Sequence, residues 1–318
     1  MAVNKRKIAK RVLLTAVVVV ALLVGIGVIM LNSSILISHR GTNIEQSYEQ
    51  MFQRYPHVES WVDSLKQVNA LKDTTIINKS GRKLHGFYVA APNPTKKTAV
   101  IVHGYTDNAI RMFMIGHLYN KELEYNILLP DLQCHGLSEG KEIQMGWKDR
   151  LDVIEWIDVA LNKVGRDNSI TLHGISMGAA TIMMVSGTEN IEQIKCYVED
   201  CGYTSVWDEF TGELKNMFNL PQFPILHVSS MLCDFLYGWN FKEASAVESV
   251  KNCNKPMFFI HGDADTFVPT WMVYDLYEAK AEPKELWIVK GAKHAVAYLE
   301  NREEYTERVS EFVERYMN

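Results

Sequence analysis

The sequence has little of what cofactor-binding and metal-binding proteins use. It contains no phosphate-binding glycine loop, no HEXXH motif and no carboxylate cluster with the spacing of metal ligands. The few cysteines form no CxxC or Cys/His pattern, which argues against a zinc site. We therefore expect no cofactor and no metal. Because the number is odd and the spacing scattered, the cysteines either form one or two disulfides in an oxidising compartment or remain buried free thiols; they are Cys134, Cys196, Cys201, Cys233 and Cys253.

Outside the first eleven residues, acidic side chains outnumber basic ones. Lys5, Arg6, Lys7, Lys10 and Arg11 leave 28 basic and 38 acidic residues for the rest of the chain, a balance of −10. A body with that charge repels nucleic-acid phosphates, so we expect no nucleic-acid partner. Hydrophobic residues make up 47% and charged residues 22% of the chain, values typical of a folded globular protein.

A long run without a charge follows the basic cluster. Residues 12–31 read VLLTAVVVVALLVGIGVIML, and a helix of that length spans about 30 Å, the thickness of the hydrocarbon core of a bilayer. We predict a single-pass transmembrane signal-anchor helix at 12–31. A buried core helix and a cleaved signal peptide are the alternatives, but the run is apolar on all sides and lacks a good cleavage site. Because basic flanks stay in the cytoplasm, we expect residues 1–11 inside and the main body on the extracytoplasmic face of the cell membrane.

The rest of the chain divides into two parts. Residues 32–74 are polar and helix-leaning, and we interpret them as a linker followed by an N-terminal helix. Over residues 75–318, short apolar runs alternate with helical segments, which predicts an α/β domain: a mostly parallel sheet covered by helices on both faces. The expected strands are 75–78, 83–90, 98–103, 126–129, 170–172, 196–198, 257–260 and 286–289, and the expected helices are 109–122, 147–163, 177–187, 270–280 and 302–316.

One connection inside this domain is too long to be a plain loop. Residues 203–250 lie between two expected strands and are rich in aromatic side chains, and connections of this length have structure of their own. We predict a helical cap insertion over the sheet. An ordinary crossover helix with long flanks is the alternative. A cap contributes to a pocket wall, and we expect Phe218, Phe223 and Phe235 to do so.

The most informative motif is Gly174-Ile175-Ser176-Met177-Gly178. It lies between an expected strand and an expected helix, and a sharp strand-to-helix turn is what exposes a serine hydroxyl for nucleophilic attack. Flanking glycines relieve the crowding at such a turn. A match of this kind arises by chance in roughly one sequence in fifteen of this length, so its place between strand and helix is what gives it weight.

Two backbone N–H groups are candidates for stabilising an oxyanion next to that serine. One belongs to Met177, directly after Ser176, and the other to Tyr105, in the His103-Gly104-Tyr105 loop after an expected buried strand. Acyl transfer on this type of sheet uses donors from these two places. A plain strand-ending turn is the alternative for the His-Gly pair.

A base and an acid follow the serine in the chain. His294 comes after the last expected strand, and Asp265 comes after the strand before it. The order serine, aspartate, histidine is that of sheet-based serine hydrolases. Asp263 in the same loop, and Asp200 after the preceding strand, are alternatives for the acid, of which Asp265 is favoured because it lies deeper in its loop.

Taken together, these stretches resemble the α/β-hydrolases, in particular bacterial membrane-anchored members of the serine aminopeptidase-like and acylglycerol lipase-like branch. The matching stretches are HGYTDN (103–108), DLQCHGLSEG (131–140), MGWKDRLDVIEWI (145–157), GISMG (174–178), HGDADTFVP (261–269) and GAKH (291–294). The resemblance implies the α/β-hydrolase fold over about residues 75–316.

The resemblance also implies roles for single residues. Ser176, Asp265 and His294 would be the catalytic triad, with Tyr105 and Met177 as the oxyanion-hole donors. Asp131 and His135 would brace the neighbouring loop, and the chain departs from the family at Gln133, where arginine is usual.

We expect a serine hydrolase that cleaves a carboxylic ester through an acyl-enzyme, an esterase or lipase-like enzyme. An aminopeptidase-like peptidase with the same triad is one alternative, and a non-catalytic binding protein that retains the fold is the other. The expected partners are a small acyl ester or peptide as substrate, and a membrane. The sequence does not indicate the oligomeric state.

Overall fold

One sheet runs through the body of the protein, in a computed structural model that describes residues 2–36, 43–188 and 191–317. Within those residues its strand order is β1-β2-β4-β3-β5-β6-β7-β8. Strands β1 and β2 pair antiparallel with their neighbours, and β4, β3 and β5 to β8 are parallel. The strands are β1 (Lys72–Ile77), β2 (Lys83–Val89), β3 (Lys97–Val102), β4 (Asn126–Pro130), β5 (Ser169–Ile175), β6 (Ile194–Asp200), β7 (Met257–Gly262) and β8 (Lys284–Val289).

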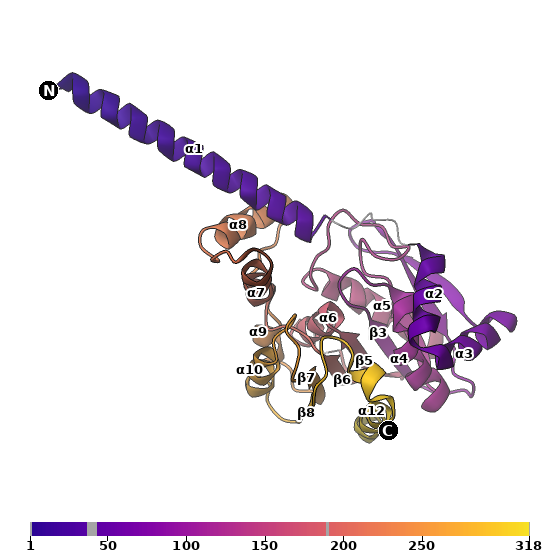
Figure 1. Ribbon diagram of the computed structural model, residues 1–318. Helices are drawn as coiled ribbons and strands as arrows, with labels where there is room; N and C mark the ends of the chain where they lie inside the picture. The colour runs from indigo at the N-terminus through magenta and orange to yellow at the C-terminus, as the bar shows by residue number, and fades with distance from the viewer. Residues whose placement is uncertain (1, 37–42, 189–190, 318) are drawn as a thin grey trace.

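Helices cover both faces of this sheet (Figure 1). Side chains alternate along a strand, so Val100 and Val102 of β3 join one apolar cluster while Ala99 and Ile101 join the other. The first cluster contains side chains of α5 (Asp149–Val164), α6 (Met177–Ser186), α9 (Ala246–Val250) and α10 (Trp271–Ala279). The second contains side chains of α2 (Ile44–Arg54), α3 (Pro56–Gln67), η2 (Ala109–Met112), α4 (Phe113–His117), η3 (Leu118–Glu122), α11 (Ala297–Glu300) and α12 (Arg302–Met317). The predicted α/β fold class is confirmed.

The parallel strands end together, and this brings distant parts of the chain to one edge. Val102 at the end of β3 pairs with Gly174 on β5, and Ile175 pairs with Asp200 on β6. Gly262 at the end of β7 pairs with Val289 on β8. The segments that follow β3, β5, β7 and β8 carry Tyr105, Ser176, Asp265 and His294, respectively. Ligands of open parallel sheets bind at this carboxyl edge.

The long connection between β6 and β7 forms helices. Helix α7 (Val206–Phe218) begins at Ser205, whose hydroxyl accepts a hydrogen bond from the backbone N–H of Asp208 at 3.1 Å, and it ends at Asn219 in the left-handed conformation. Helix α8 (Ile225–Tyr237) follows. We refer to α7, α8 and the turn between them, residues 206–237, as the cap. In Figure 1 the cap lies at the junction of the body with the N-terminal helix.

The N-terminal helix α1 (Ala2–Ser34) projects from the body as a rod (Figure 1). Among the described residues, Lys5–Ser34 is one helix with the length and composition of a membrane span, and an 18-residue window within it has a mean hydropathy of 3.1. Most of its side chains are exposed, but Leu31 and the following Ile35 are buried against the body. The backbone N–H of Ile143 donates to the Ile35 carbonyl at 2.8 Å. Residues 37–42 of the expected linker lie outside the described residues.

All five cysteines are buried free thiols. Of the two alternatives left by the sequence, the structure has the one without disulfides.

Candidate active site

Ser176 occupies a strained turn between β5 and α6. Its backbone angles, φ 56° and ψ −120°, lie in a region that residues other than glycine rarely adopt. The turn needs its two glycines for space: a Cβ on Gly174 would lie 2.3 Å from the Gly178 carbonyl oxygen, and one on Gly178 would lie 2.1 Å from that of Val102. The backbone N–H of Ser176 donates to the Asp200 carbonyl at 2.8 Å. These contacts hold the hydroxyl at the carboxyl edge of the sheet.

The structure brings the three residues predicted from chain order into one hydrogen-bonded line. The Ser176 Oγ lies 2.9 Å from His294 Nε2, and His294 Nδ1 lies 2.7 Å from Asp265 Oδ2. The Asp265 Oδ1 accepts the backbone N–H groups of Phe267 at 2.9 Å and Val268 at 3.0 Å. The carboxylate is therefore fixed by its own loop and turned toward the imidazole.

The electrostatics keep Asp265 ionised. Burial alone would raise the pKa of this carboxyl, but hydrogen bonds from His261 and His294 outweigh it and lower the pKa to about 2. An ionised carboxylate orients the imidazole and stabilises its cation.

Neither alternative acid is hydrogen-bonded to His294. The Asp263 Oδ1 accepts the backbone N–H of Gly291 at 2.5 Å. The Asp200 Oδ2 accepts the hydroxyl of Tyr305 at 3.0 Å, and burial raises the pKa of Asp200 to about 6.

Cys201 is a close neighbour of the His294–Asp265 pair, with Sγ and one ligand atom of each partner within 4.8 Å of one another. Burial raises the pKa of this thiol well above its usual value. Metal ligation requires the thiolate, so we interpret Cys201 as a packing neighbour of the pair.

Both candidate oxyanion donors lie beside Ser176. Met177 is the first residue of α6, where backbone N–H groups have no acceptor within the helix. The loop after β3 passes close by, because a Cβ on Gly104 would lie 3.4 Å from the Ser176 Cβ. Tyr105 and Met177 line the same pocket as Ser176.

The loop that carries Tyr105 is held by side chains from the DLQCHGLSEG stretch. His135 donates through Nδ1 to the Gln133 carbonyl at 2.8 Å, and its Nε2 accepts the backbone N–H of Thr106 at 3.1 Å. The Asp131 Oδ1 accepts the backbone N–H of Ala109 at 2.8 Å. Burial, followed by the neighbouring His103, lowers the pKa of His135 to about 3, so the ring stays neutral and keeps its acceptor nitrogen.

At the position where the family usually has arginine, Gln133 donates from Nε2 to Asp152 Oδ2 at 2.6 Å. Asp152 is buried, and so is its neighbour Asp149. Burial, with Asp152 as the second cause, raises the pKa of Asp149 to about 8. Gln133 thus donates a hydrogen bond to the Asp152 carboxyl group, but it has no positive charge to offset the two neighbouring carboxyl groups of Asp149 and Asp152.

A pocket of about 360 Å³ opens at Ser176, a size and apolar character typical of small-molecule sites. Three parts of the chain form it: the last turns of α1, the cap, and the loops at the carboxyl edge of the sheet. Its lining residues are Met30, Leu31, Ser33, Ser34, Tyr105, Met145, Ser176, Met177, Tyr203, Glu209, Phe210, Glu213, Leu214, Met217, Phe218, Ile225, Leu226, Ser229, Phe241 and Phe267.

The expectation for the cap aromatics is right for Phe218 and wrong for two others. Phe218 lines the pocket, whereas Phe223 and Phe235 point outward and are 69% and 87% exposed. The cause is helix geometry: the face of α8 that packs on the body carries Ile225, Leu226 and Ser229, and Phe235 falls on the opposite side.

Sequence reasoning missed two carboxyl groups in the pocket wall. Glu209 is 4% exposed, and its Oε2 has no hydrogen-bond partner. Burial, followed by Glu213 and Asp265, raises the pKa of Glu209 well above its usual value. Burial also raises the pKa of Glu213, against the opposing effect of His294. The helical spacing of Glu209 and Glu213 was visible in the sequence, but their inward direction was not.

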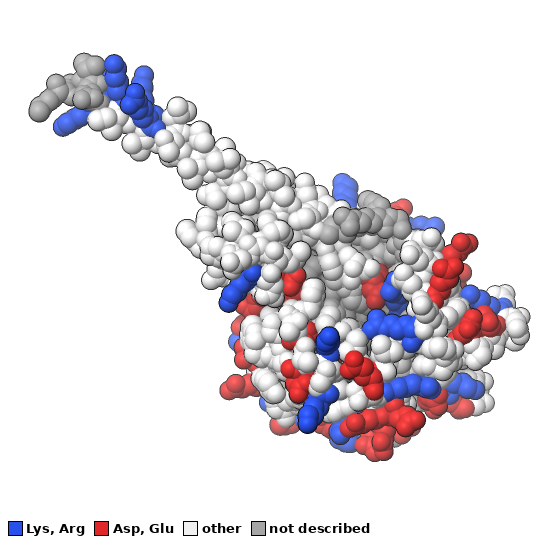
Figure 2. Space-filling view, viewed as in Figure 1, with Lys and Arg blue, Asp and Glu red and all other residues white. Residues whose placement is uncertain are grey.

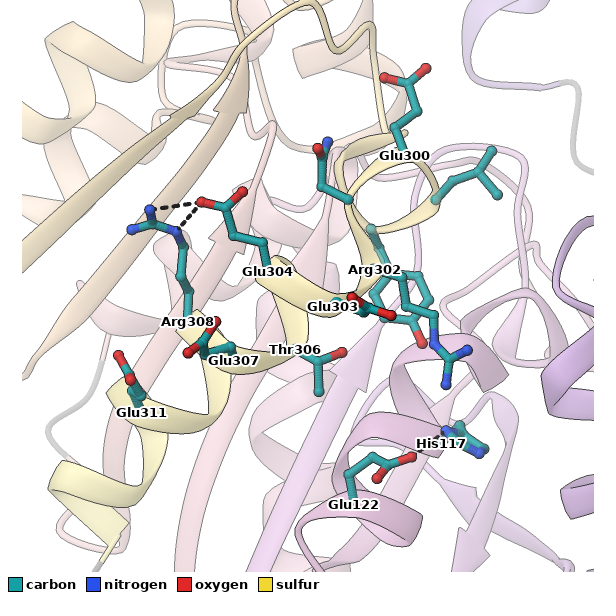
Figure 3. Close-up of a pocket in the computed structure, with 13 residues that line it drawn as sticks. His117, Glu122, Glu300, Arg302, Glu303, Glu304, Thr306, Glu307, Arg308 and Glu311 are labelled. Atoms are coloured by element: carbon teal, nitrogen blue, oxygen red, sulfur yellow. Dashed lines mark hydrogen bonds and ion pairs between the residues drawn. The ribbon is translucent and has the colours of Figure 1, made fainter.

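A larger hollow of about 1220 Å³ lies elsewhere, along α12 (Figure 3). Its labelled side chains are mostly charged, and Arg308 is paired with Glu304 one turn away, at 2.8 Å. His117 and Glu122 line its other side, 3.6 Å apart. None of the nucleophile, base or oxyanion candidates lines it, so the smaller pocket is the candidate active site.

Comparisons with known proteins agree with this geometry. A model of the prolyl oligopeptidase family matches residues 139–318. YqkD of Bacillus subtilis is 27% identical over 307 residues, which cover 96% of this chain and 97% of YqkD.

Two solved structures resemble the body. The Pyrococcus furiosus esterase Pf2001 has a TM-score of 0.63 and 28% identity, covering 80% of this chain and 96% of that one. An acylaminoacyl peptidase from Pyrococcus horikoshii has a TM-score of 0.60 over 80% of this chain and 43% of that one, and at 17% identity the likeness concerns the fold. Because the family model spans more than half of the sequence, the chain belongs to the prolyl oligopeptidase family, and it is a serine hydrolase of the α/β-hydrolase superfamily.

Proposed function

We propose that this protein is a carboxylic-ester hydrolase in which Ser176, His294 and Asp265 form the catalytic triad. The observation that carries the proposal is the hydrogen-bonded line from Ser176 through His294 to Asp265, at 2.9 Å and 2.7 Å, opening into a largely apolar pocket. The similarity to a named esterase over most of the chain supports the choice of ester.

The chemistry follows from the positions of these groups. His294 Nε2 takes the proton of the Ser176 hydroxyl as its oxygen attacks the ester carbonyl carbon. The backbone N–H groups of Met177 and Tyr105 stabilise the resulting oxyanion. His294 then returns the proton to the departing alkoxide, which leaves an acyl group on Ser176. Water attacks this acyl-enzyme by the same route and releases the carboxylic acid.

The location is part of the proposal. Helix α1 anchors the protein in the cell membrane through residues 12–31, with residues 1–11 in the cytoplasm and the catalytic body outside. Protease added to intact protoplasts should then digest the body while the first eleven residues stay protected. Digestion of the body only after lysis would contradict this orientation.

A second candidate is an aminopeptidase with the same triad. Glu209 and Glu213 place two carboxyl groups in the wall of the pocket that contains Ser176, and a carboxylate pair suits the ammonium group of a peptide N-terminus. Burial raises the pKa of both groups and so opposes their ionised forms, which a bound ammonium group would favour.

Two measurements separate these candidates. Full-length protein in detergent is offered p-nitrophenyl esters of graded chain length and aminoacyl p-nitroanilides, and a fluorophosphonate probe labels the nucleophile. We expect ester cleavage, labelling of the wild type and of a Ser310→Ala control, and no labelling of Ser176→Ala. Labelled protein that cleaves only the anilides would favour the aminopeptidase, and labelling that survives Ser176→Ala would refute the nucleophile assignment. A fold-retaining binding protein would neither react nor cleave.

A further inference from the structure

The end of α1 is part of the active-site pocket. Met30, Leu31, Ser33 and Ser34 line the same cavity as Ser176. The connection is direct, because the Tyr105 hydroxyl donates to the Ser34 carbonyl at 2.5 Å, and Leu31 is only 2% exposed. A helix that served only as a tether would need no contact with the catalytic pocket.

The cap packs against α1 at a defined position along the axis of that helix. Helix α8 packs against α1 at Gly27, where a Cβ would lie 2.9 Å from Leu232 Cδ1 and 3.1 Å from Val228 Cγ1. Gly27 lies four residues inside the end of the 12–31 run, about 6 Å along the helix axis. If that run fills the hydrocarbon core, α8 lies at the boundary between acyl chains and headgroups, the depth at which amphipathic helices insert.

The outer surface of the cap suits that depth. Residues 214–238 contain two charged side chains, Lys215 and Asp234, and present a cluster of exposed apolar side chains that we call the cap patch. Soluble surfaces scatter such residues singly and rarely gather them. In Figure 2 the uncharged surface of α1 continues into an uncharged surface at its junction with the body, whereas Lys, Arg, Asp and Glu side chains are interspersed over the rest of the body in this view. The cap patch comprises Met217, Phe218, Leu220, Phe223, Met231, Phe235 and Leu236.

Two members of the patch connect the outside of the cap with the pocket. Met217 and Phe218 are 67% and 49% exposed, yet both also line the cavity that contains Ser176. One side of the pocket rim therefore belongs to the patch and another to the end of α1. An apolar chain lying in the bilayer beside α1 would meet this rim without crossing water.

We propose that the enzyme takes its substrate from the bilayer that holds α1, and that this substrate is a long-chain acyl ester of a membrane amphiphile. The cap patch rests in the leaflet next to the body, and the acyl chain passes along Met217 and Phe218 to the wall formed by Met30 and Leu31. This places its ester carbonyl at Ser176. The inference rests on the proposed ester hydrolase and specifies the source and class of its substrate.

The test compares two substrates on the same protein. Full-length enzyme is reconstituted in phosphatidylcholine vesicles, and hydrolysis is measured for p-nitrophenyl acetate in the water and for a fluorogenic long-chain diacylglycerol embedded in the vesicles. The variant Met231→Ser/Phe235→Ser changes the patch at positions that do not line the pocket. We expect it to reduce cleavage of the embedded ester by at least about tenfold, since each large apolar side chain removed from lipid weakens insertion, with acetate cleavage within about twofold of the wild type. Val68→Ser, at an exposed apolar position remote from the cap, is the matched control and should change neither rate.

The outcomes separate this inference from the function on which it rests. Equal cleavage of the embedded ester by the patch variant and the wild type would overturn the inference, and so would a wild type that cleaves acetate but not the embedded ester. Both results leave the ester hydrolase standing. Failure of the wild type to react with either ester or with fluorophosphonate would instead remove the proposed function itself. A parallel loss of both activities in the patch variant, with an unchanged melting temperature, would also count against entry from the bilayer.

Discussion

Ser34, the last residue of α1, accepts a hydrogen bond of 2.5 Å from the hydroxyl of Tyr105, whose backbone N–H is a proposed oxyanion donor. The end of the apolar helix α1 and the loop beside Ser176 are thus joined by one side chain. The position of the helix is coupled through this bond to the geometry of the proposed oxyanion hole.

Tyr105→Phe removes that bond and keeps the ring. A net contribution of about 1 kcal/mol for such a hydrogen bond corresponds to roughly a fivefold effect. We expect kcat for short esters to fall about threefold to tenfold, with KM nearly unchanged, because the loop would hold its N–H less precisely. Steady-state kinetics in detergent measures kcat and KM separately. Tyr274→Phe, on the exposed side of α10, is the control. A change confined to KM would mean that the hydroxyl serves the pocket wall and not the oxyanion loop.

The three carboxylates that compete for the role of triad acid should differ in their effect on turnover. Asp265→Asn keeps the shape but loses the charge facing His294, and we expect kcat to fall by about 10⁴. Asp263→Asn and Asp200→Asn, whose partners are the Gly291 backbone and Tyr305, should cost far less in kcat. Circular dichroism melts of the three variants check folding. A larger loss from Asp200→Asn than from Asp265→Asn would assign the acid to β6.

Phe218→Ala should shorten the acyl-chain preference. Phe218 lines the pocket and Phe223, five positions on, points away from it, so the two make a matched pair. Each substrate methylene that loses its contact with Phe218 costs about 0.8 kcal/mol, or roughly fourfold in kcat/KM. Only esters whose acyl chain is long enough to reach Phe218 are affected. We expect a flatter profile of kcat/KM against chain length for Phe218→Ala and an unaltered profile for Phe223→Ala in detergent. Identical profiles for both variants would place the acyl chain elsewhere.

Asp149 should make stability depend on pH in an unusual direction. Its folded pKa of about 8, raised first by burial and then by Asp152, exceeds the ordinary value near 4. The folded protein then holds a proton that the unfolded chain has lost, so the Asp149 contribution falls as pH rises from about 4 to about 8 and is constant outside that window.

Asp149→Asn removes this titration. We expect the melting temperature of the wild type relative to Asp149→Asn to decline across the same window, with each kcal/mol worth roughly 2–4 °C. Asp158→Asn, on the exposed side of α5, provides the comparison. A difference between wild type and variant that stays flat from pH 5 to pH 8 would show that Asp149 does not titrate there.

Much of the site could be predicted because it depends on order and local pattern. Parallel strands bring their carboxyl ends to one edge, so residues that follow β3, β5, β7 and β8 had to meet there, whatever the details of packing. The turn at Ser176 also carries a local signature, since only glycines fit at positions 174 and 178 against the neighbouring backbone. The inner parallel strands β3 to β7 were visible as short apolar runs because a strand buried on both faces has no polar face.

Other features depend on which face of a helix meets which neighbour, and no local pattern encodes that. The aromatic content of residues 203–250 predicted a cap, but whether Phe218 of α7 or Phe235 of α8 turns inward is decided by how these two helices dock on α1 and the body. Asp265 and Asp263 are indistinguishable by type and nearly so by position, and only the folded loop aims one of them at His294.

The sequence by itself determined that α1 is a continuous apolar helix, because a run of twenty uncharged, mostly apolar residues satisfies its backbone hydrogen bonds within one helix, as a bilayer would require. It also indicated which side chains gather around Ser176, since chain order and strand ends decide which side chains meet at the edge of the sheet. Only the tertiary structure decided that Met30, Leu31 and Ser34 form part of the active-site wall. Those three residues lie more than 140 positions before Ser176 in the sequence. They reach the pocket because Gly27 lets α8 approach α1 closely enough to close the pocket between the two helices.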